Sequence, residues 1–278
     1  MARSKISLTS NSIKYILTLR YNLTKKPQIR RTNWRDFLER SAENVSEVAE
    51  SLIISNIKKS IRNSAKTKTA IALSSGVDST LVLSLLRKTR PDVKINAVSI
   101  KFADSADETK HASKIADTFD ADHKVVYVEN YLKELPAAIG IIGQPFWGLH
   151  WYYVVKKARA ITKHLASGDG GDELFGGYTF RYSKFLSLVT ESSTPLDKVK
   201  AYLACHERDN VSDQQDVFGP KAEFSWDKIY QFLLPYFDNK LDPLNQVFLA
   251  DYNGKLLYNF SIVNTKIHNH FEINNVSP

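Results

Sequence analysis

The chain has 278 residues, of which 43% are apolar and 24% are charged, values typical of a globular protein with a buried core. This length accommodates one large domain, or a core domain with a smaller appendage. A single cysteine, Cys205, excludes an internal disulfide and a cage of thiolates around a metal ion. No apolar run approaches the roughly 18 residues of a membrane-spanning helix, and the N-terminus lacks a signal-peptide core, so we expect a cytoplasmic protein.

The formal net charge is +8, and much of the excess lies before residue 70. Basic runs occur at Lys25-Lys26, Arg30-Arg31 and Lys58-Lys59, but no aromatic residues are interleaved with them in a stacking pattern. We therefore interpret them as a solvated basic surface, with contact to a polyanion such as tRNA as the alternative.

Residues 1–40 carry few structural signals. Thr32 and Asn33 are candidate caps for a helix that begins near Trp34. From about Val45 to residue 63 the spacing becomes helical, with apolar side chains on one stripe and lysines on the other face. The stripe comprises Val48, Leu52, Ile53, Ile57 and Ile61.

From residue 69 onward, short apolar runs alternate with helical stretches. The sequence predicts strands at 69–73, 95–102, 123–128 and 165–167, and helices at 80–86, 107–119, 131–141 and 152–163. Repeated alternation of strand and helix implies an α/β fold, with a parallel sheet covered by helices on both faces. After Glu173 the strand signals end, and we expect the remaining C-terminal part to be helical.

A loop of small polar residues, Ser74-Ser75-Gly76-Val77-Asp78-Ser79, joins the first apolar run to the next helix. In a parallel sheet this loop lies at the carboxyl end of a strand, where ligands bind. Gly76 permits a tight turn, the N–H groups that follow suit an anion, and the serine hydroxyls add donors. Asp78 suits a phosphate site when Mg²⁺ lies between its carboxylate and the phosphates. The alternative is a serine-capped turn in which Asp78 interacts only with the helix dipole.

A second loop, residues 167–178, contains five of the eleven glycines together with Asp169, Asp172 and Glu173. A structural turn needs one or two glycines, so we expect a backbone pressed against a ligand and carboxylates directed at a metal ion or a substrate. The alternative, a flexible surface loop, is disfavoured because the apolar pair Leu174-Phe175 follows at once and is expected to be buried.

Together the two loops resemble the synthetase domain of the asparagine synthetase family. That family carries a pyrophosphatase-type loop, S-G-G-x-D-S, and a second motif, S-G-x-G-x-D-E-L-F-G-G-Y. The likeness extends from about residue 45 to the end and includes Asp107-Glu108 and His123. It implies an adenine nucleotide alpha-hydrolase-like fold for residues 45–278, without the N-terminal glutaminase domain of some members, and leaves residues 1–44 as an N-terminal basic segment.

The resemblance implies a ligase that binds ATP and Mg²⁺, adenylates a carboxylate, most simply that of aspartate, and lets ammonia displace AMP. It assigns Asp78 and Asp172 as Mg²⁺ ligands and places Asp169 near the acyl acceptor as a catalytic residue. Lys266 is the candidate for the cation that stabilises the transition state, with a plain surface lysine as the alternative. Contacts to ATP and pyrophosphate fall to Leu73, Ser74, Ser75, Gly76, Asp78, Ser79, Ile100 and Gly168.

Four departures from the family pattern stand out. Ser75 replaces the first glycine of the loop, and Asp169 replaces a glutamate. A Lys-x-Asp-Arg segment is expected near residues 261–264 and is not matched there, and the sequence stops at Pro278 where family members continue. Lys255 falls in an apolar helical stretch, and we expect it on the solvated face.

The nitrogen source differs as well. Residue 2 is Ala, where glutamine-dependent members have their nucleophilic cysteine, and residues 1–44 are too few for a hydrolase domain. Free ammonia or a separate glutaminase is therefore expected. Cys205 is expected to be a structural thiol, because adjacent residues on a helix, here Cys205 and His206, point apart.

Two other functions remain open. One is another acyl-adenylating enzyme, which forms an amide or lactam or modifies a tRNA or a cofactor. The other is a nucleotide-binding regulatory protein that has lost catalysis. The sequence is compatible with a homodimer and gives no sign of a membrane partner.

Overall fold

The computed structural model describes residues 9–22, 29–37, 45–103, 105–207 and 217–276. The chain forms two compact units. We call them the sheet unit (residues 42–142, 148–171 and 264–278) and the helical unit (residues 1–41, 143–147 and 172–263). The expected boundary between residues 44 and 45 rests on the sequence alone and stays a prediction.

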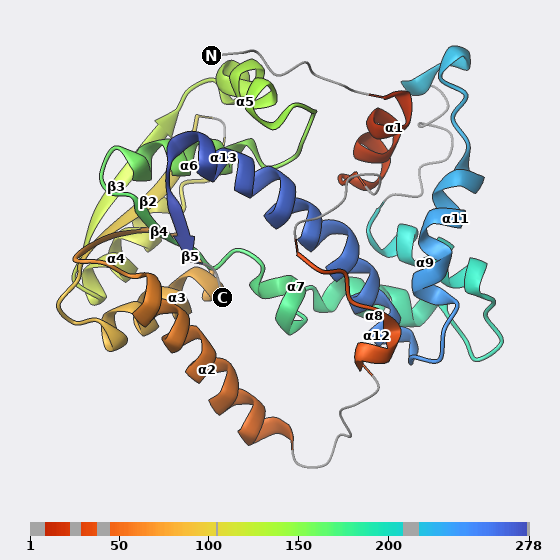
Figure 1. The fold of residues 1–278 in the computed structure, drawn as a ribbon, viewed down its shortest axis with the longest axis horizontal. Coiled ribbons are helices and arrows are strands. Elements are labelled where there is room, and N and C mark those ends of the chain that lie inside the picture. Colours follow the sequence, from red (N-terminus) through yellow and green to blue (C-terminus); the bar gives the residue numbers. More distant parts are fainter. Residues whose placement is uncertain (1–8, 23–28, 38–44, 104, 208–216, 277–278) are drawn as a thin grey trace. The chain divides into compact units, whose positions relative to one another are not determined.

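The sheet unit is built on five parallel strands in the order β3-β2-β1-β4-β5 (Figure 1). The strands are β1 (Lys68–Ala72), β2 (Lys94–Phe102), β3 (Ala121–Val128), β4 (His164–Ala166) and β5 (Asn274–Val276). The order along the chain reverses between β1 and β4, and such a reversal opens a crevice at the carboxyl ends of the two strands.

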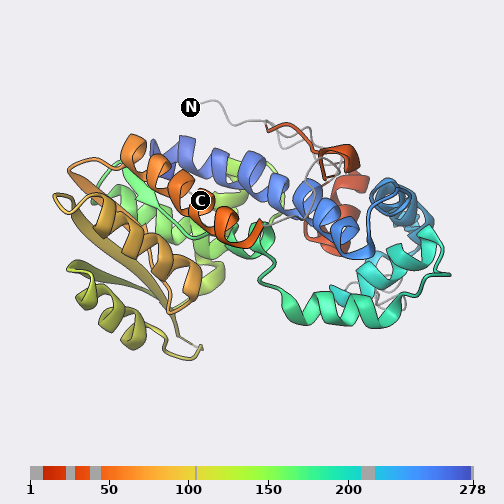
Figure 2. The same cartoon turned by 90° about the horizontal axis from the view of Figure 1, so that it is seen from below.

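Helices cover both faces of this sheet (Figure 2). One face carries α2 (Val45–Ser64), α3 (Val77–Thr89) and α4 (Thr109–Thr118), which share a single apolar core with the strands. The other carries α6 (Leu149–Arg159), which packs against α5 (Leu135–Ile142) and α13 (Thr265–Phe271), with the 3-10 turn η2 (Tyr131–Glu134) before α5. The expected parallel α/β sheet with helices on both faces is therefore confirmed.

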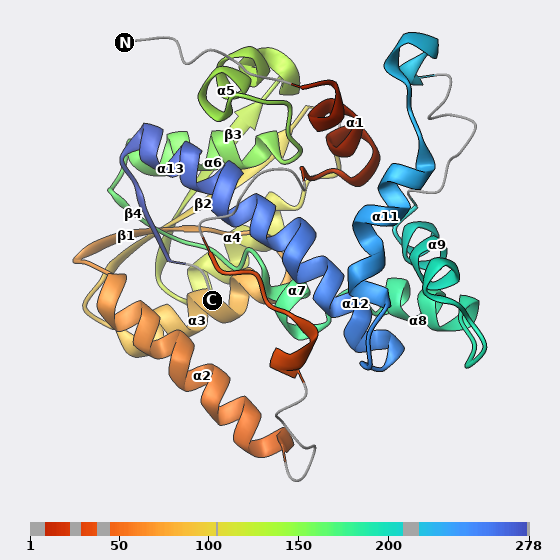
Figure 3. The ribbon, with the colours of Figure 1, turned by 45° about the vertical axis from the view of Figure 1, so that its right-hand side comes forward.

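The helical unit contains the bulk of the C-terminal part, as expected (Figure 3). Its elements are α1 (Ser10–Leu19), η1 (Trp34–Phe37), most of α7 (Gly171–Phe175), α8 (Thr179–Leu188), α9 (Pro195–Cys205), η3 (Pro220–Ala222), α11 (Trp226–Phe237), α12 (Pro243–Asp251) and the π-helical turn η4 (Tyr252–Leu256). A second π-helical turn, η5 (Asn259–Asn264), follows. Helix α9 starts with a capping box between Thr194 and Asp197, and the side chain of Asp242 caps α12, so local sequence sets where both helices begin.

Some elements differ from expectation. Strand β5 was not expected, because its asparagines carry no strand signal and its backbone is ordered by pairing with β4. Helix α1 was also missed, and the helix expected near Trp34 is only the short 3-10 turn η1. On α2, Leu52 is 53% exposed rather than inward, while Ile57 and Ile61 are buried. The side chain of Val48 and the pair Lys25-Lys26 lie outside the described residues.

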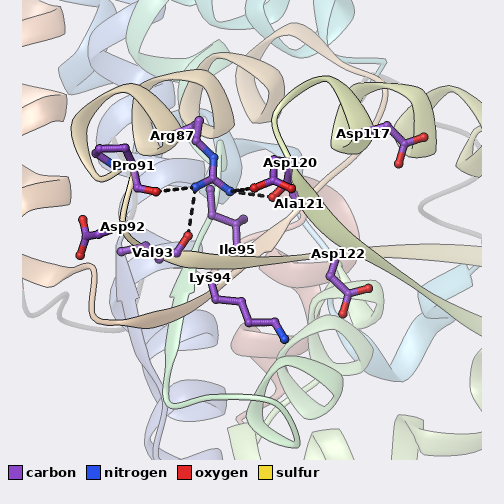
Figure 4. Close-up of a pocket in the computed structure, with 10 residues that line it drawn as sticks. All are labelled: Arg87, Pro91, Asp92, Val93, Lys94, Ile95, Asp117, Asp120, Ala121 and Asp122. Atoms are coloured by element: carbon purple, nitrogen blue, oxygen red, sulfur yellow. Dashed lines mark hydrogen bonds and ion pairs between the residues drawn. The ribbon is translucent and has the colours of Figure 1, made fainter.

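A hollow of about 550 Å³ lies at the amino ends of β2 and β3 (Figure 4). Its centre is the guanidinium of Arg87, which donates to the carbonyl oxygens of Pro91 (3.0 Å), Val93 (3.1 Å) and Asp120 (2.6 Å). Because these bonds join the end of α3 to the loops before β2 and β3, we interpret the hollow as structural. Ligands of parallel sheets bind at the opposite, carboxyl ends of the strands.

No helix among the described residues is both long enough and apolar enough to span a membrane. The expected cytoplasmic location stays a prediction.

One half-buried histidine, His268, makes the stability of the sheet unit depend on pH. The indole Nε1 of Trp151, on α6, donates to Nε2 of His268, on α13, at 3.1 Å. Nε2 accepts this bond only when it carries no proton, and burial lowers the pKa of His268 from 6.5 to about 4. The neutral ring thus stabilises the fold above the ordinary pKa, and this contribution is lost as the pH falls through the lowered pKa.

We therefore predict that the midpoint of thermal unfolding falls more steeply between pH 6.5 and about 4 in the wild type than in His268→Gln, whose amide oxygen still accepts the indole bond. His270→Gln, at an exposed position of the same helix, is the control and should follow the wild type. Equal slopes for wild type and His268→Gln would show that His268 is not held neutral.

Candidate functional site

The residue before the first loop, Leu73, is held in place at the end of β1. Leu73 is 4% exposed, and its carbonyl oxygen accepts a hydrogen bond of 2.7 Å from the hydroxyl of Ser99 on β2. The same hydroxyl lies 2.8 Å from Nε2 of His123 on β3. Burial lowers the pKa of His123, which keeps this ring neutral near pH 7. Three neighbouring strands thus hold the start of the loop.

Two serines give the loop its shape. The hydroxyls of Ser74 and Ser79 lie 3.0 Å apart, and the Ser74 hydroxyl also accepts from the N–H of Gly76 at 3.1 Å. The Ser79 hydroxyl accepts from the N–H of Ser74 at 3.2 Å. These bonds close the loop on itself, so its conformation loses little further entropy when a ligand binds.

The start of α3 is open to an anion. Gly76 is the N-cap residue and supplies no side chain to bond the free N–H groups of the first turn, so a ligand can accept from them. Gly76 has φ −78°, a value that any residue adopts, so the turn does not depend on the conformational freedom of glycine. Its value lies in the absent side chain, because a Cβ there would meet the Ser74 hydroxyl at 3.2 Å.

Ser75 occupies the position of the first glycine in the family motif. Its hydroxyl donates to Oε2 of Glu108 at 3.3 Å, so this side chain contacts the residue that precedes α4. Ile100, the other predicted nucleotide contact from a strand, is half-buried in β2.

The second loop follows β4 and packs directly on the first. A Cβ at Gly168 would lie 2.6 Å from the backbone carbon of Asp78 and from the nitrogen of Ser79, and one at Gly171 would lie 2.6 Å from Cγ of Asp78. Gly170 has φ 93°, which disfavours other residues. The backbone was expected to be pressed against a ligand, and these contacts show Gly168 and Gly171 pressed against the first loop. The expected burial of Leu174 and Phe175 is wrong, because they are 44% and 51% exposed.

Asp169 is held by the segment in which the family's charged motif was expected. Nδ2 of Asn264 donates to Oδ2 of Asp169 at 3.0 Å. Lys266, two residues further along, donates from Nζ to the carbonyl oxygen of Ile142 at the end of α5. Asn264 of this segment therefore contacts the predicted acceptor residue Asp169.

Asp172 belongs to the helical unit, whereas the other predicted site residues belong to the sheet unit. It lies in the first turn of α7, as Asp78 lies in the first turn of α3. Gly177 has no side chain and leaves room for the Asp172 carboxylate. No group of three metal-ligating side chains gathers within the described ranges. Mg²⁺ binds proteins through one or two carboxylates together with substrate phosphates, so the carboxylate of Asp78 in the first turn of α3 suits this ion.

A second charged cluster, missed in the sequence, follows Asp172. Nζ of Lys255 lies 2.6 Å from Oε1 of Glu173 and donates to the hydroxyl of Tyr178 at 2.8 Å, and that hydroxyl donates to the same Glu173 oxygen at 2.9 Å. Burial and the Glu173 charge raise the pKa of Tyr178. The structure therefore differs from the expected solvated Lys255. No local pattern links positions 173 and 255, so only the fold reveals the pair.

Cys205 is buried, and its environment suits a structural thiol. Its sulfur lies 3.1 Å from Nδ1 of His206, so the expectation that these side chains point apart is wrong, because α9 ends at Cys205. Burial nevertheless raises the pKa of the thiol to about 12, which leaves almost no nucleophilic thiolate at neutral pH.

Comparison with known proteins supports the family resemblance that the two loop motifs indicate. The model of the family described as asparagine synthase matches residues 56–259, more than half of the chain. A protein of Methanocaldococcus jannaschii, provisionally named glutamine-hydrolyzing asparagine synthetase 2, is 36% identical over 111 residues, covering 38% of this chain and 22% of the relative. The glutamine-hydrolyzing asparagine synthetase 1 of Bacillus subtilis is 33% identical over 124 residues, covering 42% and 19%. The matches thus span about a fifth of these relatives' length.

Among solved structures, an NMN synthetase from Francisella tularensis aligns with 82% of this chain and 96% of its own, at 16% identity and a TM-score of 0.35. A likeness of this extent carries no inference about function.

The loop packing predicts a sharp difference between glycines. Gly168→Ala and Gly171→Ala each place a methyl group 2.6 Å from atoms of Asp78, so we expect each to lower the free energy of unfolding by about 1–3 kcal/mol, the usual cost of overpacking. Gly140→Ala is the matched control, because no atom lies within 4 Å of its Cβ and alanine favours helix α5. Urea unfolding measures all three. Wild-type stability in Gly168→Ala would mean that the loops do not touch.

Proposed function

Because the chain belongs to the asparagine synthase family, we propose that it is an ATP- and Mg²⁺-dependent ligase that adenylates a carboxylate, with aspartate as the favoured substrate, and converts it to an amide. The observation that carries this proposal is the packing of Gly168 and Gly171 on Asp78, at the carboxyl ends of β1 and β4. This packing brings the first loop, which we propose binds the phosphates, and the second loop, which contains Asp169, together where parallel sheets bind ligands.

In the proposed reaction, a carboxylate oxygen attacks the α-phosphorus of ATP, and the bond to the β-phosphate oxygen breaks to release pyrophosphate. Ammonia then attacks the acyl carbon of the adenylate, AMP leaves, and the nitrogen loses a proton. A carboxylate alone is a poor electrophile, so the adenylate supplies the leaving group that the second step needs.

Residues of the chain have distinct roles in this proposal. The free N–H groups at the start of α3 and the hydroxyls of Ser74 and Ser79 would bind the departing pyrophosphate, and this binding favours the transition state as its charge grows. Leu73, Ile100 and Gly168 would contact the adenosine. Asp78 and Asp172 would hold Mg²⁺, which neutralises phosphate charge when bound. Asp169, oriented by Asn264, would position the carboxylate substrate or its nucleophile.

The nitrogen source that we propose is ammonia, either free or delivered by a separate glutaminase. The raised pKa of Cys205 argues against this thiol as the nucleophile of a glutaminase reaction.

One observation favours a second substrate choice. Asn264 donates a hydrogen bond to Asp169 from the segment in which the family pattern has charged residues. The charge near the acceptor therefore differs from the family pattern. A different carboxylate, joined in an amide or a lactam, would suit this change. A screen of carboxylates for pyrophosphate release separates the two, because aspartate should give the highest kcat/KM if the main proposal holds.

The metal assignment makes the first prediction about activity. Asp78→Asn and Asp172→Asn should each abolish pyrophosphate release, because each removes a charged Mg²⁺ ligand, while circular dichroism should show an intact fold. Asp117→Asn, an exposed residue of α4, is the control and should retain activity. Pyrophosphate release is measured with ATP, aspartate and ammonium at saturating Mg²⁺. Wild-type rates in either variant would exclude that residue as a ligand.

The second prediction about activity concerns Lys266, the candidate cation. If Lys266 stabilises the charge that grows on the α-phosphate, Lys266→Ala should lower kcat by about 10²–10³-fold and change ATP affinity far less. Lys255→Ala serves as the comparison, because its partner is Glu173. An activity loss in Lys266→Ala below about threefold would assign Lys266 to the surface, and a large loss in Lys255→Ala alone would transfer the role to Lys255.

A further inference from the structure

The helical unit contains a small cavity that the proposed reaction does not use. Its volume is about 80 Å³, and its polar lining includes Arg20, Arg181, Tyr202, His206, Asp251 and Lys255. None of these residues is among the predicted nucleotide, metal or acceptor contacts. The cavity therefore calls for an explanation of its own.

Two arginines, Arg20 and Arg181, line this cavity, and each packs over an aromatic ring. The guanidinium of Arg20 lies 4.8 Å from the ring centre of Trp147, and that of Arg181 lies 4.1 Å from the ring centre of Tyr178. Burial and then the charge of Arg181 lower the pKa of Arg20. The charge of Glu207 acts in the opposite direction and raises the pKa of Arg20. Two guanidinium groups at one cavity offer several N–H donors to an oxyanion.

A buried carboxylate lines the same cavity. Asp251 is 1% exposed, and its Oδ1 accepts a hydrogen bond of 2.8 Å from the Tyr202 hydroxyl and lies 3.1 Å from Nε2 of His206. Its Oδ2 has no hydrogen-bond partner among the described residues. Burial acts to raise the pKa of Asp251, but His206, Tyr202 and Lys255 outweigh it and the pKa is lowered. Asp251 is therefore an ionised acceptor with an oxygen to spare, and an unmatched buried acceptor is costly.

We propose that this cavity binds a small oxyanion that carries a proton, such as hydrogen phosphate or bicarbonate. The charged oxygens of the ligand accept from Arg20 and Arg181, and its hydroxyl donates to Oδ2 of Asp251. A fully deprotonated oxyanion would place a lone pair against Asp251 and be repelled. The requirement for a proton is what reconciles two arginines with an aspartate in one site.

The size of the cavity limits the ligand. A cavity of about 150 Å³ is enough for a benzene ring, so about 80 Å³ suits a molecule of roughly four or five non-hydrogen atoms. Phosphate and bicarbonate meet this limit. A nucleotide or an amino acid with a long side chain exceeds it.

The test compares phosphate with sulfate, which has the same shape and keeps no proton at pH 7. Isothermal titration of the full chain without ATP should show binding of inorganic phosphate or of bicarbonate, titrated separately, and sulfate should bind at least about tenfold more weakly than phosphate, because it cannot donate to Asp251. Equal affinity for sulfate and phosphate, or no binding of either phosphate or bicarbonate, would overturn the proposal.

Variants locate the bound ion. Arg181→Met should weaken binding at least about tenfold, whereas Lys184→Met, an exposed position of the same helix, should leave it unchanged. Asp251→Asn supplies an amide donor and should bring the affinity for sulfate close to that for phosphate. If Asp251→Asn does not fold, the wild-type preference and Arg181→Met still decide the question.

The first loop is a second place where phosphate could bind, and one variant separates the two. Ser79→Ala removes a hydroxyl from that loop and leaves the cavity intact, so it should not change the binding proposed here. Binding that is lost in Ser79→Ala and kept in Arg181→Met would assign the ion to the loop and contradict the cavity site.

Discussion

The backbone of the second loop packs directly on Asp78 of the first loop, and the sheet unit depends on that contact. Gly168 and Gly171 lie against Asp78 because β4 pairs with β1 in parallel, so the two loops leave the sheet from adjacent strands. The contact fixes the carboxylate of Asp78 and the first turn of α3 together. The pairing of β1 with β4 and the small size of the glycines therefore position the second loop beside the first.

The two edges of the sheet are held by different means. At the carboxyl edge, short polar side chains from neighbouring strands, Ser99 and His123, hold the carbonyl of Leu73 and leave room for a ligand. At the amino edge, the single long side chain of Arg87 gathers several carbonyl groups. An arginine at the carboxyl edge would fill the space that the proposed nucleotide needs, so the shorter side chains there are compatible with the proposed site.

Much of the sheet unit was predictable, because its signals are local. The run from Thr69 to Leu73 followed by the first loop indicates a strand, a turn and a helix within a few residues. β5 was not predictable, since its asparagines carry no strand signal and its backbone is ordered by pairing with β4. The same limit applies to the site: both loops carry recognisable residues, whereas the contact of Asn264 with Asp169 joins positions 95 residues apart. Lys255 and Glu173 are also far apart in the sequence, and no periodicity connects them.

The number of residues in the π-helical turn η4, and not only their types, determines where the side chains after the turn point. A π-helical hydrogen bond joins residues i and i+5, whereas an α-helical one joins i and i+4. The additional residue sets the phase of the helix, that is, the direction in which the following side chains point. Removing one residue from this turn would restore α-helical spacing and rotate the next side chains by about 100°. Tyr258, whose hydroxyl accepts from the Gln144 amide at 2.8 Å, would then face elsewhere. Substitutions leave this phase intact, whereas a change of length by a single residue erases it.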